Sequence, residues 1–570
     1  MPNGNGDPAI YILHSSFCLT ETVETSAFCL LPLALINMRP SEPIAEPGGY
    51  FSLILHAHLP FVRHPEHEKF LEESWLCEAI TESYLPLLDV MNGWQRDGLN
   101  ARLTMTLSPT LCSMLRDPLL QDRYTRHLEG LLSLAENEIH RTHWDRTCRE
   151  LARMYHHRFT SVRNTYLACG RDLVGAFRKL QEHGRLEIIT TAATHALLPL
   201  LGNHPPAVRA QILVARDHYR DCFGCDPRGI WLPECAYFEG VEAALQEANL
   251  RWFVVDTHGL LHARPRPRHG VVAPIFTPNG IAAFGRDFDS SRQVWSKHVG
   301  YPGDPRYRDF YRDIGFDLDF DYVKPHLPSP DHRGFTGLKY FRITGGTADK
   351  QVYDRGAALR AAAEHAGHFL EARMAQIRQL TGVLDQPPLL VAPYDAELFG
   401  HWWYEGPEFL DAFVRKARCH QNLLELITPE EYLRRHPTHQ IATPSPSSWG
   451  EAGHYRVWLN EHNEWIYPHL QVAQERMSAL ARRSTRLDAL EERALKQAAR
   501  ELLLAQASDW AFMLRSGASR EYARQRVKAH LLRFSALQDQ LTHSRVDEMG
   551  LREIEQRDNL FPELQCGYWV

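Results

Sequence analysis

Short apolar runs alternate with long stretches of helical period from Tyr50 onward. The runs end in turn residues, which predicts buried parallel strands. They lie at residues 50–55, 101–107, 186–191, 229–232, 252–255 and 389–392. The helical patterns between them lie at 119–138, 148–183, 208–219 and 241–248. This alternation predicts an α/β fold, either a barrel or an open doubly wound sheet.

Other segments depart from this alternation. Residues 1–48 hold an interrupted apolar stretch with no Lys or Arg before it, which predicts neither a signal peptide nor a spanning helix. We expect an N-terminal extension that is disordered or a mis-assigned start, with Met38 as the alternative first residue. Residues 49–427 form the main α/β domain. Residues 291–350, rich in Gly, Pro, Asp and Tyr, predict an insertion over the strand ends, with a mobile lid at 284–303.

The end of the chain has a different character. Residues 470–541 are rich in Ala, Leu, Arg and Glu at helical period, which predicts a C-terminal helical domain over 428–545. A tail at 546–570 follows.

The composition of the chain limits the cellular compartments and the binding partners that we expect for the protein. The net charge of -7 and the pI near 6.5 give no indication of binding to nucleic acid or to a membrane surface. The 11 cysteines are odd in number and have no recurring spacing, which favours a reducing cytoplasm over a disulfide framework. Cys222 and Cys225 form a lone C-x-x-C, which is weak evidence for zinc or redox chemistry.

Polar side chains follow the predicted strands at their carboxyl ends. They are His56 and His58, Thr194 and His195, Glu234, Asp256 and His258, and Asp395. In a βα barrel this is the face where active sites assemble. Five strands that end in this way predict a site, although a single such histidine is more often structural.

Glu234 and Asp395 each end an apolar run and lie among aromatic residues. Two carboxyl groups about 5 Å apart can cleave a glycosidic bond with retention, and aromatic neighbours can stack on sugars and keep one carboxyl protonated. Glu397 and Glu405 are alternatives to Asp395. Glu397 would face the same side of the strand.

His56 and His58 are two residues apart, so both would point the same way on a strand. That spacing suits hydrogen bonds to sugar hydroxyls, and it also suits a metal, as in deacetylases. We favour sugar binding because no Asp-rich motif accompanies the pair.

Five ordered motifs closely resemble those of glycoside hydrolase family 57, and within it those of the 1,4-α-glucan branching enzymes. They lie at residues 56–60, 193–195, 231–237, 394–403 and 449–451, and the resemblance runs from about residue 49 to about 534. It implies an incomplete (β/α)7 barrel with a helical domain that completes the cleft. The extension before residue 49 departs from the family pattern.

The resemblance also implies a site and a substrate. Glu234 would be the nucleophile and Asp395 the general acid/base of a retaining enzyme that needs no metal or other cofactor. Its substrate would be an α-glucan such as amylose or glycogen, whose cleaved chain is transferred to a 6-hydroxyl. The expected sugar-binding side chains are His56, His58, His195, Trp295, Trp402, Trp403, Trp449 and Trp458.

Three other functions stay open at this point. The same scaffold could support an α-amylase or a 4-α-glucanotransferase, because the motifs define the bond cleaved better than the acceptor. A metal-dependent deacetylase is a second alternative. A non-enzymatic glucan-binding module is the third, but binding alone does not need two carboxylates in matched contexts.

Overall fold

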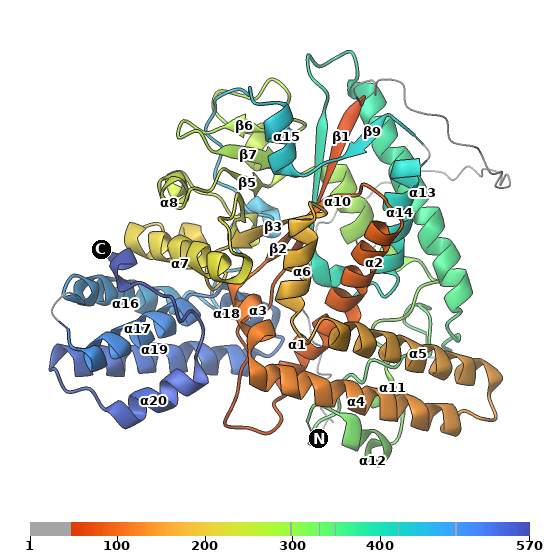
Figure 1. Cartoon of the computed structure of the whole chain (residues 1–570), viewed down its shortest axis with the longest axis horizontal. Coiled ribbons are helices and arrows are strands. Elements are labelled where there is room, and N and C mark those ends of the chain that lie inside the picture. Colours follow the sequence, from red (N-terminus) through yellow and green to blue (C-terminus); the bar gives the residue numbers. More distant parts are fainter. Residues whose placement is uncertain (1–46, 297–298, 330, 348, 420, 485–486) are drawn as a thin grey trace.

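The computed structural model describes residues 47–570 except 297–298, 330, 348, 420 and 485–486. The expected N-terminal extension therefore lies, apart from residues 47 and 48, outside the described part of the chain. At the centre is a nine-stranded sheet in the order β6-β7-β5-β4-β3-β2-β1-β8, with β9 paired to β1 (Figure 1). The strands are β1 (Gly49–Ala57), β2 (Leu103–Leu107), β3 (Leu186–Thr191), β4 (Gly229–Trp231), β5 (Trp252–Val255), β6 (Ile275–Phe276), β7 (Ala282–Gly285), β8 (Leu389–Asp395) and β9 (Leu424–Leu426).

The sheet curls until its two ends almost meet. All the pairings among β1 to β5, β7, β8 and β9 are parallel, and β6 alone in this sheet pairs antiparallel, with β7. Arg286, just after β7, forms a single parallel bridge with Val391 of β8, and the Asp287 N–H donates to the Val391 carbonyl at 2.7 Å. This confirms the expected incomplete (β/α)7 barrel and excludes the alternative of an open doubly wound sheet.

The structure contains the predicted helices, except that one of them is divided into two. They are α4 (Pro118–Arg141), α5 (Arg146–Ala168), α6 (Leu173–Glu182), α7 (Pro205–Phe223) and α8 (Val241–Glu247). The single helix expected at 148–183 is two helices, because Gly170 and Arg171 adopt φ of 67° and 66° and end α5. Asp172 then begins α6 as its N-cap, where its carboxylate accepts from the Gly175 N–H.

A helical bundle packs beside the barrel, below α7 in Figure 1. It consists of α16 (Ile466–Ala481), α17 (Ala489–Ala505), α18 (Ser508–Ser516), α19 (Arg520–Thr542) and α20 (Glu548–Arg557). The expected tail is thus part of the packed structure, since it includes α20 and the fully buried Trp569. The start of the expected helical domain instead packs on the barrel, where α15 (Pro429–Arg435) is followed by backbone bridges to Phe276, Arg264 and Tyr237.

The segment 291–350 packs mainly on the outer helices. Tyr322 and Tyr340 donate hydrogen bonds to Glu138 of α4, and the Tyr155 hydroxyl of α5 donates to the Lys339 carbonyl. The short helices α11 (Ile314–Asp317) and α12 (Phe320–Val323) lie near α4 in Figure 1.

The expected mobile lid is a folded element over most of its length. Residues 284–303 contain the end of β7, then α10 (Phe288–Trp295) and a short 3-10 turn at Tyr301–Gly303; residues 297 and 298 lie outside the described part. Asp287 caps α10 by accepting from the Ser290 N–H, and Gln376 of α13 (Arg355–Leu380) donates to the same carboxylate. These contacts attach α10 to the barrel wall, and they contradict the prediction of a mobile loop.

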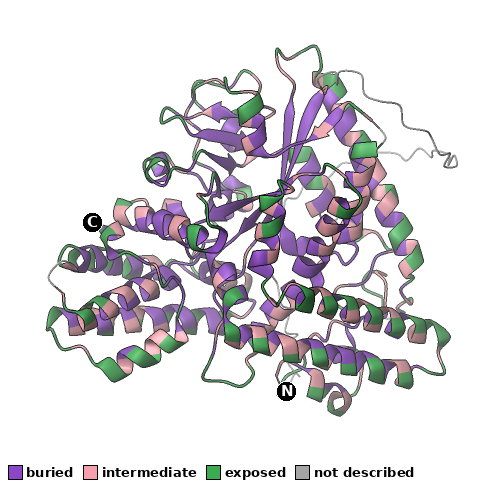
Figure 2. Cartoon of the chain, viewed as in Figure 1, coloured by how far each residue is buried: buried purple, intermediate pink, exposed green. Residues whose placement is uncertain are grey.

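Figure 2 shows that the strands and the inward faces of the helices are buried, while exposed positions lie on the outer helical faces and the loops. Across the described residues, no helix combines the length and the apolar character needed to span a bilayer.

Candidate active site

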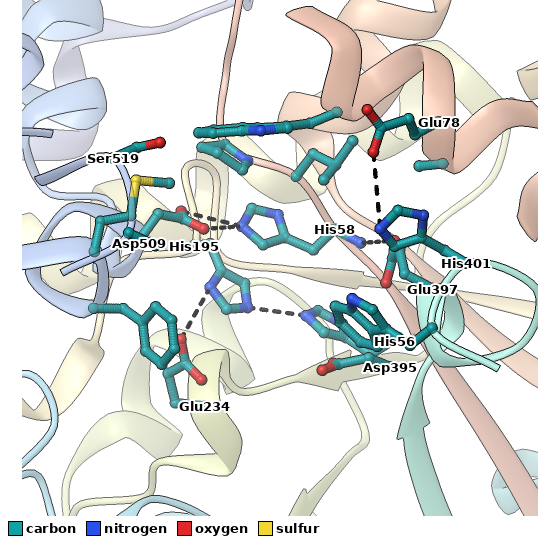
Figure 3. Close-up of a pocket in the computed structure, with 18 of the residues that line it drawn as sticks. His56, His58, Glu78, His195, Glu234, Asp395, Glu397, His401, Asp509 and Ser519 are labelled. Carbon is teal, nitrogen blue, oxygen red and sulfur yellow. Dashed lines mark hydrogen bonds and ion pairs between the residues drawn. The ribbon is translucent and has the colours of Figure 1, made fainter. Parts of the chain in front are cut away.

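A pocket opens where the carboxyl ends of the barrel strands face the helical bundle (Figure 3). The barrel and its loops supply most of the wall, and the bundle supplies the rest through α18 and the start of α19. The residues that line it are His56, His58, Leu59, Pro60, Trp75, Glu78, Ala79, His195, Glu234, Asp395, Glu397, His401, Trp402, Trp449, Asp509, Phe512, Met513, Ala518 and Ser519. Two domains therefore share one site.

Glu234 occupies a strained turn just past β4. Its backbone lies in the left-handed region, with φ 61° and ψ 23°, and Cys235 follows with φ 53°. Such a conformation costs about 1–3 kcal/mol for a residue other than glycine. The Trp449 backbone N–H donates to the Glu234 carbonyl at 3.1 Å and helps to hold this turn. The strain aims the carboxylate into the pocket.

Two donors fix the Glu234 carboxylate. The Trp449 indole Nε1–H donates to Oε2 at 2.9 Å, and the Ser508 hydroxyl donates to Oε1 at 3.0 Å. Ser508 lies at the start of α18, so the bundle holds a side chain of the barrel in place. Hydrogen bonds of this kind stabilise the ionised form of a carboxyl.

A directed chain of hydrogen bonds leads to Glu234 from the histidines. Because Ser508 donates to Glu234, its oxygen accepts from His195 Nδ1–H at 3.0 Å. His195 Nε2 is then unprotonated and accepts from His56 Nε2–H, also at 3.0 Å. This leaves His56 Nδ1 without a proton, and that buried atom has no hydrogen-bond partner among the described residues.

Both histidines in this chain are neutral. Burial, and then the neighbouring His58, hold the pKa of His56 and of His195 well below the usual value. Each ring therefore donates through one nitrogen and accepts through the other, as the hydrogen-bond chain requires. His195 also has a left-handed backbone, with φ 57°, and its carbonyl accepts from the Ser508 N–H at 3.1 Å.

Asp395 is the second carboxyl of the pocket, at the end of β8 and in register with His56 of β1. Its Oδ2 is buried with no hydrogen-bond partner in the described structure. Burial, and then the charges of Glu397 and Glu234, raise the pKa of Asp395 well above its usual range. Figure 3 shows Asp395 and Glu234 on the same side of His56 and His195.

The carboxyls of Glu234 and Asp395 lie in different environments, which affect their pKa values differently. Burial raises the pKa of Glu234 to about 7, while the Trp449 and Ser508 hydrogen bonds oppose that rise. Asp395 has no such donors, and the charge of Glu234 is itself one of the causes that raise its pKa. This asymmetry favours an ionised Glu234 beside a protonated Asp395, which is the pairing of nucleophile and acid that a retaining glycosidase needs.

The two rivals of Asp395 lie in different environments. Glu397 lines the pocket but accepts hydrogen bonds from the Tyr84 hydroxyl and from the His58 N–H, the latter at 3.3 Å. Glu405 is fully buried away from the pocket, where it accepts from Tyr353. Of these three acids, Asp395 is the one that both lines the pocket and has a buried oxygen, Oδ2, without a hydrogen-bond partner among the described residues, since the unpartnered Oε2 of Glu405 lies away from the pocket.

His58 links the barrel to the bundle. Its Nε2 lies 3.2 Å from both carboxylate oxygens of Asp509 in α18, and its Nδ1 lies 2.9 Å from the Ser108 hydroxyl. His58, His195 and Asp509 bring ligand atoms close enough to hold a metal ion. Every ring nitrogen of these two histidines, however, already has a protein partner, so ion binding would replace existing hydrogen bonds.

The tryptophans expected or found at the site divide into two groups. Trp75, Trp402 and Trp449 line the pocket, and the half-buried Trp295 lies at its edge, with ring centroids 6.5 Å from Trp402 and 6.4 Å from Trp449. Of these, the sequence analysis did not name Trp75.

Trp403 and Trp458 are core residues. They are 1% and 2% exposed and do not line the pocket. Trp403 packs on Phe409, with the ring centroids 4.7 Å apart, and Trp458 lies against Gly450, where an added Cβ would come within 2.6 Å of the ring. Tyr301, expected on the lid, is also buried, and its hydroxyl pairs with His368. In this structure none of the three can stack on a sugar.

The remaining strand-end residues support the site from outside the pocket. Asp256 binds Arg286 at 3.0 Å and His258 at 3.2 Å, and Arg286 is the cation whose charge moderates the raised pKa of Asp395. The Thr194 hydroxyl donates to the Leu503 carbonyl of the bundle.

With Glu234 as the expected nucleophile, which must be ionised to attack, the acid limb of the pH profile of kcat/KM should lie near the Glu234 pKa of about 7. Trp449→Phe removes a donor to the charged form, so the Glu234 pKa should rise and the limb should move up by about one pH unit. Trp295→Phe is the matched control, because Trp295 Nε1 has no partner among the described residues, and its limb should stay in place. An unmoved limb in Trp449→Phe would mean that Trp449 serves only as a ring surface.

Two family models together match most of the chain. The family model for glycosyl hydrolase family 57 matches residues 52–444, and the model for the C-terminal part of 1,4-alpha-glucan branching enzymes matches residues 469–569. The second match covers the bundle that supplies Ser508 and Asp509.

Individual proteins match over most of their length. A 1,4-alpha-glucan branching enzyme of Thermococcus kodakarensis is 33% identical, with 92% of this chain and 78% of that protein covered. The structure of an alpha-amylase from Thermotoga maritima is 44% identical with a TM-score of 0.86, covering 91% of this chain and 99% of that one. The structure of a GH57-type branching enzyme from Pyrococcus horikoshii is 32% identical with a TM-score of 0.82, covering 92% and 97%.

Proposed function

Because the chain belongs to glycosyl hydrolase family 57, we propose that it is a 1,4-α-glucan branching enzyme with Glu234 as nucleophile and Asp395 as general acid/base. The observation that carries this proposal is the support of Glu234 by Ser508. That serine belongs to the bundle, which matches the C-terminal model of branching enzymes.

In the first step, ionised Glu234 attacks the anomeric carbon of an α-1,4-linked glucosyl unit. The bond to the glycosidic oxygen breaks as protonated Asp395 gives that oxygen its proton, and the released chain end departs. A β-linked glucosyl-enzyme remains on Glu234. The donors Trp449 and Ser508 hold the carboxylate in its attacking position, and the unpartnered Oδ2 of Asp395 is free to face the leaving oxygen.

In the second step, Asp395 is a carboxylate and takes the proton of a glucan 6-hydroxyl. The oxygen attacks the anomeric carbon, the ester bond to Glu234 breaks, and an α-1,6 link forms with overall retention. Both carboxyls return to their starting protonation, so no further reactant is needed.

The acceptor distinguishes branching from hydrolysis. The apolar wall of Trp75, Phe512 and Met513 favours a sugar chain over water at the intermediate, because it leaves few polar atoms to bind water. An α-amylase is the second candidate, and the 44% identical structure named as one favours it. The two functions share the first step and differ in what attacks second.

The test is incubation of the purified enzyme with amylose. We expect α-1,6 linkages in the proton NMR spectrum to exceed new reducing ends; reducing ends without α-1,6 linkages would identify an amylase. The same assay after exhaustive EDTA treatment should give unchanged products. Activity that is lost with EDTA and restored by zinc would instead favour deacetylase-like metal chemistry at His58, His195 and Asp509.

We also propose that the product is a glycogen-like polymer and that the enzyme works in the cytoplasm. The odd number of cysteines without a recurring spacing supports a reducing compartment.

A further inference from the structure

A cluster of thiols and charged side chains lies apart from the pocket, where α3 (Pro109–Arg116) packs against α7. Cys222, the first cysteine of the C-x-x-C motif, lies in the last turn of α7, and Cys112 lies in α3. Their exposed fractions are 3% and 1%. The proposed mechanism uses neither residue.

His218, one turn before Cys222, is held as an imidazolium by its hydrogen bonds. Its Nδ1 lies 2.9 Å from a carboxylate oxygen of Glu563, which can only accept. Its Nε2 lies 3.2 Å from the Ser113 hydroxyl, which already donates its own proton to the Pro109 carbonyl and must accept here. Both ring nitrogens therefore carry protons, and the ring is positively charged.

The sulfur of Cys222 lies between two cations. His218 Nε2 is 3.7 Å from it, and Arg116 Nη1 donates to it at 3.4 Å. Each cation also has an acid beside it, since Glu563 is paired with His218 and Asp221 with Arg116. Positive neighbours of this kind convert a thiol to a thiolate. In accord with this, the Cys112 hydrogen bond and the His218 charge lower the pKa of Cys222 despite its burial.

Cys112 supplies a second thiol at the same place. Cys112 lies one turn before Arg116, the residue of α3 that donates to the Cys222 sulfur, and a Cys112 hydrogen bond is the first of the causes that lower the pKa of Cys222. We propose that Cys222 is a peroxide-reactive thiolate and that Cys112 is its resolving partner, so that oxidation links α3 to α7 by a disulfide.

The chemistry balances with hydrogen peroxide as the oxidant. The Cys222 thiolate attacks one peroxide oxygen, the O–O bond breaks, and the departing hydroxide takes a proton to become water. The Cys112 sulfur then attacks the sulfur of the Cys222 sulfenic acid, the S–O bond breaks, and a second water leaves as the Cys112 thiol proton is lost. Two thiols are oxidised to one disulfide, and one peroxide is reduced to two waters. Arg116 and Asp221 are exposed members of the cluster, with 43% and 44% of their side chains exposed, so we expect peroxide to enter beside them.

A metal site is the competing interpretation, because His218, Asp221 and Cys222 bring ligand atoms within 4.8 Å of one another. Arg116 already binds both the Asp221 carboxylate and the Cys222 sulfur. A cation in that position repels a second one, so the arrangement favours a thiolate over a metal ligand.

The two helices also support the active pocket. Ser108, the N-cap of α3, contacts His58, and Gln211 of α7 donates to the Thr194 hydroxyl and accepts from the Thr194 N–H, beside His195. A disulfide between α3 and α7 would therefore join two helices that hold pocket histidines.

The test treats the reduced full-length protein with hydrogen peroxide, blocks remaining thiols and maps peptides without reduction. We expect a linked pair of peptides containing Cys112 and Cys222 that dithiothreitol separates. Cys225→Ser, which removes the exposed cysteine of the same motif, should give the same product and is the matched control.

Two further variants test the role of the charge. His218→Gln keeps a hydrogen-bond donor but removes the positive charge, and should slow disulfide formation by about ten-fold or more. The ultraviolet absorbance of the Cys222 thiolate is obtained by subtracting the absorbance of Cys222→Ser from that of the wild type. It should show a titration below neutral pH. The peptide map and the His218→Gln rate remain informative if Cys222→Ser does not fold.

Three results would overturn the proposal. They are a Cys222–Cys225 link as the main product, an unmodified Cys222 after peroxide has oxidised exposed thiols, and one equivalent of bound zinc that is lost in Cys222→Ser.

Discussion

Glu234→Gln is expected to lower turnover on amylose by about four orders of magnitude or more, because it removes the proposed nucleophile. The fold should persist, because Gln has the same size and can still accept from the Trp449 indole. Loss of a buried carboxyl whose pKa is raised by burial removes a cost of folding at neutral pH, so thermal stability should be equal or higher. Turnover, circular dichroism and thermal unfolding check the three parts.

The matched control for this variant is Glu405→Gln. Glu405 is as deeply buried but lies away from the pocket, so its replacement should affect stability through Tyr353 and leave turnover of the folded protein within about ten-fold. A folded Glu234→Gln protein with near-normal turnover would refute the nucleophile assignment.

Asp395→Asn should reduce turnover on amylose by about three orders of magnitude or more, because the amide cannot give a proton to the leaving oxygen. The loss should depend on the leaving group. A maltooligosyl fluoride needs no proton to release fluoride, so the first step on that substrate should remain measurable in Asp395→Asn. In Glu234→Gln it should be abolished. Fluoride release in the two variants therefore separates the roles.

The pH profile gives a second criterion for Asp395. With Asp395 as the proposed acid, the alkaline limb of kcat/KM on amylose arises when Asp395 loses its proton, so the residual activity of Asp395→Asn on amylose should lack that limb, while the acid limb of Glu234 remains. If Glu397→Gln shows this pattern in place of Asp395→Asn, the acid/base role belongs to Glu397.

The barrel and its strand-end residues could be predicted from the sequence because both are local patterns. Apolar runs followed by His58, Glu234 or Asp395 are visible within a few residues, and parallel strands bring their carboxyl ends together in any such fold. The closure of the barrel could not be predicted from local patterns, because it depends on a backbone bridge between residues 286 and 391, which are far apart in the sequence.

The bundle's contribution to the site could not be predicted from spacing. Ser508 hydrogen-bonds to Glu234 across 274 positions of sequence, and nothing around it in α18 differs from an ordinary helix start. The choice among tryptophans failed for a related reason. Trp402 and Trp403 are neighbours in sequence, but one side chain lines the pocket and the other packs on Phe409.

Composition also misled the prediction for the lid. The Gly, Asp and Ser residues of 284–303 are typical of a loop, but Asp287 acts as a helix cap and its carboxylate is bound by Gln376 from α13. A partner 89 positions away decides whether such residues form a helix or a loop.

Because Glu234 has a left-handed backbone, selection for stability and selection for activity favour different residues at this position. Glycine or asparagine would occupy that turn with less strain than glutamate, so a directed-evolution screen that scores heat resistance alone rewards replacement of the residue. The same holds, more weakly, for His195. A mutant library made to raise the thermal stability of this protein should therefore be screened for glucan product at every round. Alternatively, the codons for Glu234 and His195 should be kept fixed.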